Sequence, residues 1–267
     1  MASINGGSGR SSHVPFLSVL SIFLAANLIA SSLNHIDDTD ETYGYYEPLH
    51  YLLYGVGMQT WEYSPLYAIR TYTFITPFWG MCSVLKLFRF SKLNIFFGIR
   101  IILGITTALS ETHFVSAVYE NYGRVIGNFT FFFTLFSSGI LYCSTALLPS
   151  AVIMSLVMIA SASWLRHQYS LTIFLGCISV LWSGWPFAGV IFVPFGLHML
   201  VDTYSSSTDA EGSTYSNLKR VSSLAIRGAT ILGLVLALSL AVDFFMYSKR
   251  YQLLFATSQS SSYFPSS

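Results

Sequence analysis

The stretch Pro15-Phe-Leu-Ser-Val-Leu-Ser-Ile-Phe-Leu-Ala-Ala-Asn-Leu-Ile-Ala-Ser-Ser-Leu33 contains no charged side chain. A bilayer core about 30 Å thick needs about 20 mostly apolar residues per helix, so this stretch predicts a membrane-spanning helix. It is longer than the apolar core of a signal peptide, and no small-residue cleavage site stands out at its end. We interpret it as an uncleaved first membrane helix that is also the signal anchor, with a cleaved signal peptide as the alternative.

The composition of the whole chain agrees with a membrane protein, since 53% of its 267 residues are hydrophobic and only 9% are charged. Ordinary soluble domains carry about 25% charged residues. The formal net charge of +1 gives no support for a nucleic-acid partner. The three cysteines lie in apolar segments, so we expect neither a disulfide framework nor a zinc site. The predicted fold class is an all-α membrane protein whose partner is the lipid bilayer.

Apolar runs of suitable length predict about seven transmembrane helices. They cover approximately residues 15–33, 71–88, 94–118, 125–148, 150–165, 169–200 and 228–247. The run at 169–200 is too long for one straight span and contains Trp185-Pro186. We expect either a kinked helix there or two pieces that meet at this dipeptide.

Basic residues beside the spans predict the orientation, because they remain preferentially on the cytosolic side. With seven spans, the basic residues that flank the first, second and sixth runs all lie on one side of the membrane. They are Arg10, Lys86, Arg89, Lys92, Lys219, Arg220 and Arg227. The acidic, tyrosine-rich segment at 34–68 then lies on the luminal side. Arg124 and Arg166 violate this pattern.

The predicted organisation is a cytosolic N-terminus at residues 1–14, a transmembrane module at 15–255 and a disordered tail at 256–267. Within the module, residues 34–68 form the luminal loop and residues 201–226 a cytosolic loop. The second loop is rich in Ser and Thr, which is typical of a flexible connector.

The luminal loop opens with His35-Ile-Asp-Asp-Thr-Asp-Glu41, where four acidic residues fall within five positions. Like charges at this density raise the pKa of some carboxyls unless a cation compensates. A perturbed carboxylate at a membrane surface is a candidate general base. Asp38-x-x-Glu41 also fits a helix capping box, in which the acids only satisfy backbone N–H groups. The spacing leaves both readings open.

Aromatic side chains accumulate over the rest of the loop, between Tyr43 and Tyr67. Such amphipathic rings favour the headgroup zone, so the loop is expected to lie on the membrane as one or two short interfacial helices. The rings could instead stack on sugars. Two other side chains have alternative readings: His50 makes either a structural hydrogen bond or a substrate contact, and Arg70 either binds a phosphate or extends to the headgroups.

Two segments of this loop carry a resemblance to a known family. They are Asp38-Thr-Asp-Glu-Thr-Tyr-Gly-Tyr-Tyr-Glu-Pro-Leu-His-Tyr-Leu-Leu-Tyr-Gly55 and Gln59-Thr-Trp-Glu-Tyr-Ser-Pro-Leu-Tyr-Ala-Ile-Arg70. Both resemble the first luminal loop of the α-1,2-mannosyltransferases of asparagine-linked glycosylation, in glycosyltransferase family 22. Gly184-Trp-Pro-Phe187 resembles a shorter patch of the same family.

The resemblance implies transfer of mannose, with inversion, from dolichyl-phosphate mannose to a dolichyl-diphosphate oligosaccharide at the luminal face of the endoplasmic reticulum membrane. It implies that Asp40 and Glu41 fall on the family's acidic pair and Asp38 on an accompanying acid. We predict Asp40 as the catalytic base, with Asp38 and Glu41 orienting it or the acceptor. The predicted substrate-binding residues are Arg70, His50, Tyr46 and Trp61.

No metal or cofactor is required, because a phosphate leaving group needs cationic stabilisation more than protonation. A cluster such as Asp37, Asp38 and Asp40 could nevertheless bind a divalent cation. One departure concerns Tyr43-Gly-Tyr-Tyr-Glu-Pro48, where the family commonly reads Phe-Asn-Tyr-Trp-Glu-Pro. Another is length: family members continue with further membrane helices, so we expect this chain to correspond to the N-terminal half of such an enzyme. The alternatives are a related mannosyltransferase of glycosylphosphatidylinositol-anchor synthesis and a non-catalytic truncated fragment. A transporter is less favoured, because charged side chains such as Arg100 and Asp243 are few within the expected spans, while charge concentrates in the loop at 34–68.

Overall fold

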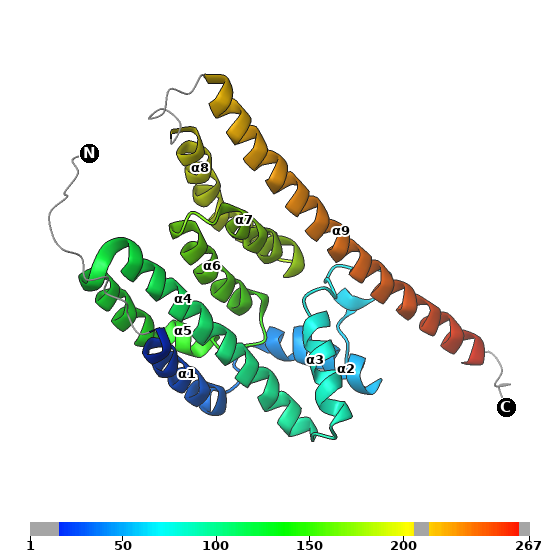
Figure 1. The fold of residues 1–267 in the computed structure, drawn as a ribbon. Helices are drawn as coiled ribbons and strands as arrows, with labels where there is room; N and C mark the ends of the chain where they lie inside the picture. The colour runs from blue at the N-terminus through cyan, green and yellow to red at the C-terminus, as the bar shows by residue number, and fades with distance from the viewer. Residues whose placement is uncertain (1–15, 206–213, 262–267) are drawn as a thin grey trace, which may run out of the picture.

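The computed structural model describes residues 16–205 and 214–261, and within these ranges every element is a helix or a helical turn (Figure 1). The predicted cytosolic segment at residues 1–14 lies outside the described residues. The elements are α1 (Phe16–Leu33), the π-helical turn η1 (Glu41–Tyr46), α2 (Glu47–Tyr54), the 3-10 turn η2 (Trp61–Tyr63), α3 (Thr76–Leu87), α4 (Lys92–Leu135), α5 (Ser138–Cys143), α6 (Pro149–Leu165), α7 (Tyr169–Cys177), the π-helical turn η3 (Ile178–Trp182), the 3-10 turn η4 (Pro186–Ala188), α8 (Gly189–Ser205) and α9 (Thr214–Ser261).

Four helical segments are long and apolar enough to cross a membrane. They are Phe16–Leu33, Lys92–Leu135, Pro186–Ser205 and Asn217–Lys249. Two further apolar helices, Pro149–Leu165 and Tyr169–Trp182, are shorter. The all-α membrane class is therefore confirmed for the described residues, while the number of spans stays a prediction.

Helix α4 is divided into two arms at Gly123, whose backbone leaves the helical region with φ of 81°. Glycine adopts this left-handed conformation without steric cost. The chain turns back at this point, since the hydroxyl of Tyr119 donates to the side chain of Asn128 and Phe131 packs on Phe23 of α1. The predicted break between the runs at 94–118 and 125–148 is found here. The second run is itself interrupted after Leu135, where α4 ends.

The structure does not form the expected membrane-spanning helix at residues 71–88. Its helix, α3, has 12 residues and rises about 18 Å, which is too short for the bilayer core. The indole N–H of Trp79 donates to the carbonyl of Leu52 at 3.3 Å, and the ammonium of Lys86 donates to the carbonyl of Leu53. Lys86, in the last turn of α3, therefore lies beside the loop at 34–68.

The long apolar run at 169–200 forms two helical pieces, which confirms the second of the two expectations for this run. The break covers Ser183 to Trp185, and Gly184 takes a φ of 69°. Helix α9 is longer than the predicted span at 228–247. It begins at Thr214 and continues to Ser261, so the predicted connector and tail are helical where the structure describes them.

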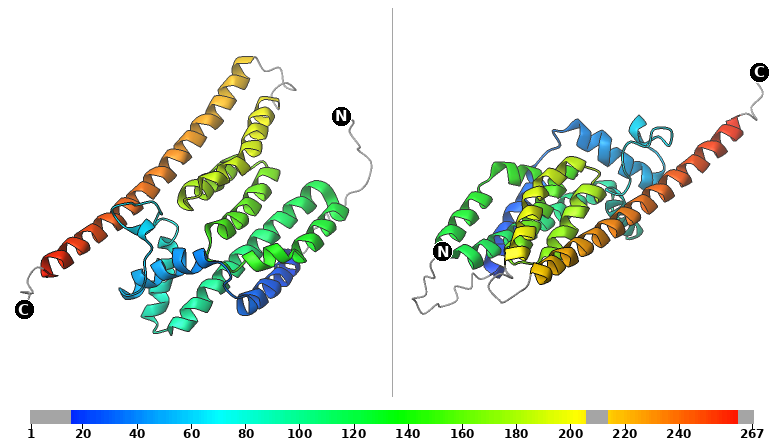
Figure 2. Two further views of the ribbon diagram at one scale, coloured as in Figure 1. Left: turned by 180° about the vertical axis from the view of Figure 1, so that it is seen from behind. Right: turned by 90° about the horizontal axis from the view of Figure 1, so that it is seen from above.

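The packed helices have two ends that we call the loop end and the opposite end. At the loop end, the amide of Asn34 donates to the carbonyl of Leu141 at 2.9 Å. At the opposite end, Arg166 forms two hydrogen bonds with Glu120, at 2.7 and 2.9 Å. Helix α9 runs from beside α8 to the segment between η2 and α3 (Figures 1 and 2). Residues of α9 therefore contact the segment before α3, although the two are far apart in the sequence.

Candidate active site

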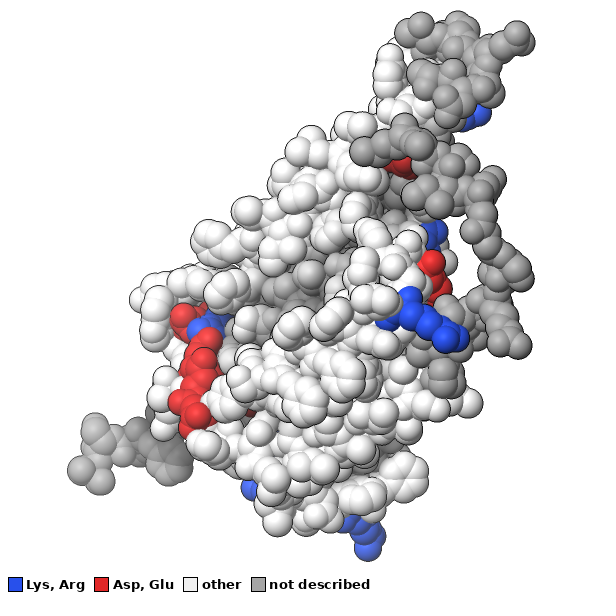
Figure 3. Space-filling model, turned by 90° about the vertical axis from the view of Figure 1, so that its left-hand side faces the viewer, with Lys and Arg blue, Asp and Glu red and all other residues white. Residues whose placement is uncertain are grey.

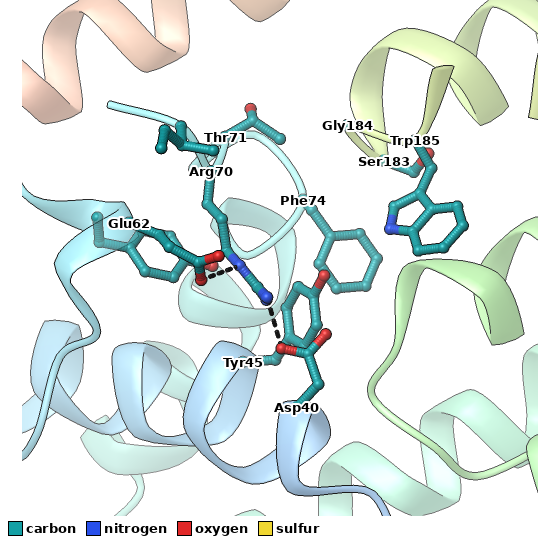
Figure 4. Close-up of a pocket in the computed structure, with 11 residues that line it drawn as sticks. Asp40, Tyr45, Glu62, Arg70, Thr71, Phe74, Ser183, Gly184 and Trp185 are labelled. Atoms are coloured by element: carbon teal, nitrogen blue, oxygen red, sulfur yellow. Dashed lines mark hydrogen bonds and ion pairs between the residues drawn. The ribbon is translucent and has the colours of Figure 1, made fainter. Parts of the chain in front are cut away.

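A cavity of about 260 Å³ opens at the loop end, where residues 40–74 face the break between η3 and η4 (Figure 4). Charged side chains are sparse on the face drawn in Figure 3, and the acidic ones gather mainly in one strip. The polar and aromatic side chains that line the cavity include Asp40, Tyr45, Glu62, Arg70, Thr71 and Trp185. This is the cavity in which two of the predicted site residues, Asp40 and Arg70, meet.

Arg70 lies between two carboxylates. Its Nη2 is 2.6 Å from Oδ1 of Asp40, and its Nε is 2.6 Å from Oε2 of Glu62 (Figure 4). The guanidinium carbon is 5.2 Å from the ring centroid of Tyr45, a cation–π distance. The remaining nitrogen, Nη1, is buried and has no hydrogen-bond partner among the described residues. An unpaired charged donor of this kind is costly, and a small movement of the side chain would let it bind an anionic ligand.

Arg70 remains positively charged at this site. Burial opposes the charge, but the hydrogen bond to Asp40 and the nearby negative charges outweigh it, so the pKa of the guanidinium is raised above its usual value. Burial raises the pKa of Tyr45 to about 12, so that its phenol stays neutral at physiological pH. Asp40 is the more accessible partner, with 43% of its side chain exposed. A ligand can therefore reach the carboxylate.

Gly44 makes room for the pair of Arg70 and Asp40. A Cβ atom at this position would lie 2.2 Å from Nη1 of Arg70 and 2.3 Å from Oδ1 of Asp40. Real Cβ atoms essentially never come so close to another heavy atom, so any side chain here would displace one partner. The glycine that departs from the resembled pattern is thus a local requirement of this geometry.

Helix α9 fixes the backbone at Arg70. The hydroxyl of Tyr247 donates to the carbonyl of Arg70. The carboxylate of Asp243 accepts from the hydroxyl of Thr71 at 2.7 Å and from the backbone N–H of Tyr72 at 2.7 Å. It also accepts from the N–H of Thr73 at 3.2 Å. The charged residue noted in the last apolar run therefore acts as a clamp on the segment that carries Arg70.

The other two predicted acids have different environments. Asp38 accepts the backbone N–H of Asp40 at 2.8 Å, which is a capping contact and also orients Asp40. Glu41 does not complete the capping box and does not line the cavity. It is buried and accepts the N–H of Leu147 at 2.9 Å, just before α6. Burial raises the pKa of Glu41, although this hydrogen bond and the charge of Arg100 favour the carboxylate.

The three remaining predicted site residues do not line the cavity. The ring of Tyr46 packs on Phe96 at 5.1 Å. His50 is bonded through Nδ1 to the carbonyl of Val56 at 2.9 Å, as in the structural reading. Trp61 is 61% exposed and packs edge-on against Tyr67. Two of the seven predicted residues thus line the cavity, and the other five do not.

The sequence interpretation missed Glu62, Tyr45 and Trp185 as lining residues. Glu62 stands inside a segment quoted for the resemblance, and a second carboxylate near Arg70 was the available signal. Trp185 belongs to the break that the Trp-Pro dipeptide predicted. Among residues 16–205 and 214–261, no group of three or more His, Cys, Asp and Glu side chains could hold a metal ion.

Comparison with known proteins gives consistent matches. The model of the Alg9-like mannosyltransferase family matches residues 18–257. The chain is 41% identical over 181 residues to alpha-1,2-mannosyltransferase Alg9 of Drosophila melanogaster. The aligned region covers 67% of the chain and 29% of that relative. It is 35% identical over 179 residues to the Homo sapiens protein of that name, covering 67% of the chain and 29% of the relative. The Arabidopsis thaliana protein is 31% identical over 248 residues, covering 92% of the chain and 40% of the relative.

The matches cover 29% to 40% of the lengths of these three relatives. No solved structure matches the chain significantly.

Proposed function

The chain belongs to the Alg9-like mannosyltransferase family, and from this premise we propose that the cavity at Asp40 and Arg70 is where mannose is transferred from a lipid-linked donor. The proposed donor is dolichyl-phosphate mannose, and the proposed acceptor is a dolichyl-diphosphate oligosaccharide that receives an α-1,2-linked mannose. The observation that carries this proposal is the unpaired Nη1 of Arg70, a cationic donor beside an accessible carboxylate.

The two groups have complementary tasks in this transfer. The acceptor hydroxyl forms a new bond to the anomeric carbon of mannose, while the bond from that carbon to the phosphate oxygen breaks and configuration is inverted. Asp40 receives the hydroxyl proton, and Arg70 stabilises the charge that develops on the leaving phosphate. A guanidinium can hold two phosphate oxygens at once, which suits this task.

The apolar surroundings of the cavity support a lipid-linked donor. A second cavity of about 500 Å³ shares Trp185 with the first and lies along α6 and α8. Its other lining residues include Ile153, Met154, Val157, Phe187 and Ile191. An isoprenoid chain in this groove would leave its phosphate near Arg70.

The contacts at the two ends support seven crossings with revised boundaries. In this arrangement α1, the first arm of α4, residues 124–143, α6, α7 with η3, α8 and α9 each cross once. Residues 34–92 then lie together at the luminal side, including Lys86 and Lys92. Arg124 and Arg166, which violated the earlier orientation, fall on the cytosolic side with Glu120. The proposed location is the endoplasmic reticulum membrane, with the active loop in the lumen.

The test is a transfer assay with the purified chain in lipid vesicles, dolichyl-phosphate [14C]mannose and a lipid-linked oligosaccharide acceptor. Labelled product that an α-1,2-specific mannosidase releases is the expected result. Absence of product from folded, membrane-inserted protein would contradict the proposal for this chain.

A further inference from the structure

Two lysines meet over one aromatic ring on the other side of the η1–α2 segment. The ammonium of Lys86 lies 4.7 Å from the ring centroid of Tyr54, and that of Lys92 lies 4.6 Å from it. The two charges are therefore no more than about 10 Å apart. In the part of the chain that the structure describes, neither lysine forms an ion pair with a carboxylate. Two exposed like charges held this close favour a shared anion.

His50 holds one of these ammonium groups in place. Its Nδ1 lies 2.9 Å from the carbonyl of Val56, and because a carbonyl only accepts, Nδ1 carries the proton. In the neutral ring Nε2 is then an acceptor, and it lies 3.1 Å from the ammonium of Lys92. The imidazole thus orients Lys92 without neutralising its charge.

An apolar cavity of about 210 Å³ adjoins the lysine pair, between α2 and α4. Lys92 and His50 stand among its lining residues. The one carboxylate there, Glu47, accepts the backbone N–H of Met58 at 3.1 Å. The apolar lining residues are Ile36, Leu49, Leu53, Ile95, Phe96 and Ile99. A ligand that fits both parts has an anionic head and a hydrocarbon chain.

We propose that this is a binding site for a polyisoprenyl diphosphate, the anchor of the acceptor. Lys86 and Lys92 contact the diphosphate, and the first isoprene units lie in the cavity between α2 and α4. Ammonium groups bind phosphate as point charges, and a diphosphate offers one phosphate to each. Its role as acceptor anchor rests on the proposed function, whereas the chemistry of the ligand rests on the lysine pair and the cavity.

The position of this site agrees with its proposed use. Tyr45 lines the cavity of Asp40, and the next residue, Tyr46, lines the cavity beside Lys92. The two sites therefore lie on different faces of one short helical segment. From Asp40 to His50 the helical rise gives a separation of roughly 15 Å. This distance leaves room for sugar units between the diphosphate and the reacting hydroxyl.

A binding experiment tests the proposal without any sugar transfer. The full chain in phosphatidylcholine nanodiscs is titrated with geranylgeranyl diphosphate, and separately with geranylgeranyl monophosphate and inorganic diphosphate. We expect the isoprenyl diphosphate to bind most tightly, and the double variant Lys86→Gln/Lys92→Gln to bind it at least tenfold more weakly. The matched control is Lys219→Gln/Arg220→Gln at the opposite end, which should bind as the unaltered chain does.

The outcomes separate this inference from the proposed function. Unchanged binding in the Lys86→Gln/Lys92→Gln variant would overturn the site, even if the chain transfers mannose. Displacement of the ligand by an equal amount of phosphatidylserine would also overturn it, because the lysines would then be general interfacial anchors. The double variant Lys86→Arg/Lys92→Arg keeps both charges and should retain binding, and an unchanged thermal unfolding midpoint of the Gln variant in the same nanodiscs shows that its loss of binding is not misfolding. Loss of transfer in an Asp40 variant leaves the binding result intact.

Discussion

The Nη2 atom of Arg70 lies 2.6 Å from Oδ1 of Asp40, so the proposed phosphate-binding group and the proposed base are paired before any substrate binds. The guanidinium holds the carboxylate in place through a charge-assisted hydrogen bond. A donor phosphate that engages Arg70 would compete with Asp40 for its hydrogen bonds. Donor binding would then release the base, which couples the arrival of the leaving group to proton transfer.

Arg70→Lys should lower kcat about tenfold and Arg70→Ala about a hundredfold or more, because an ammonium cannot reproduce the paired hydrogen bonds to phosphate. The measurement is transfer from dolichyl-phosphate mannose at saturating acceptor. Arg166→Lys is the matched control, since Arg166 also pairs with a carboxylate but at the opposite end. If Arg70→Lys is as active as the unaltered chain, the phosphate role is wrong.

Gly44→Ala should separate Arg70 from Asp40, because the added Cβ would overlap both side chains. We expect at least a tenfold loss of transfer with normal membrane insertion. Gly80→Ala in α3 is the control, since no atom lies within 4 Å of the position that its Cβ would take. That variant should keep full activity and gain up to about 1 kcal/mol in stability from helix propensity. Full activity of Gly44→Ala would show that the pair is not required.

Asp243→Asn should weaken the clamp on residues 71–73, since hydrogen bonds to a charged acceptor are worth about 1.5–3 kcal/mol each. The expected effect is a rise in KM for the donor of about tenfold, with a smaller change in kcat, because Arg70 would be less well positioned. Asp202→Asn is the matched control: Asp202 accepts from Tyr169 at the opposite end. A change in kcat alone would argue against a positioning role.

Cysteine labelling tests the revised crossings. In a variant without the native cysteines, Val56→Cys and Phe88→Cys should react with a membrane-impermeant maleimide from the same side, and His167→Cys from the other. All three positions are exposed. Reaction of Phe88→Cys from the same side as His167→Cys would restore the expected span at 71–88.

Local sequence features predicted the elements that depend on local chemistry. The charge-free run ending at Leu33 predicted α1, and Trp185-Pro186 predicted the break before η4. The family resemblance singled out Asp40 and Arg70, which do meet.

Contacts between residues far apart in the sequence could not be predicted from these local features. Glu41 accepts from Leu147, 106 positions away, and Asp243 accepts from Tyr72, 171 positions away. No pattern along the chain marks such partners. The length of the helix before Lys86 was overestimated for a related reason: the apolar residues counted from 71 to 88 include a segment that turns before Thr76, so that only a short helix remains.

The most direct test of the account compares two neighbouring carboxylates. Asp40 faces Arg70 in the cavity, whereas Asp37 accepts from Tyr142 at 2.6 Å and contacts His35 at 2.7 Å. Asp40→Asn and Asp37→Asn each remove one negative charge with little change in shape. Initial rates of mannose transfer by the two variants should differ sharply: a loss of at least a hundredfold for Asp40→Asn, and nearly full activity for Asp37→Asn. Transfer by Asp40→Asn at the rate of the unaltered chain would contradict the assignment of Asp40 as the base.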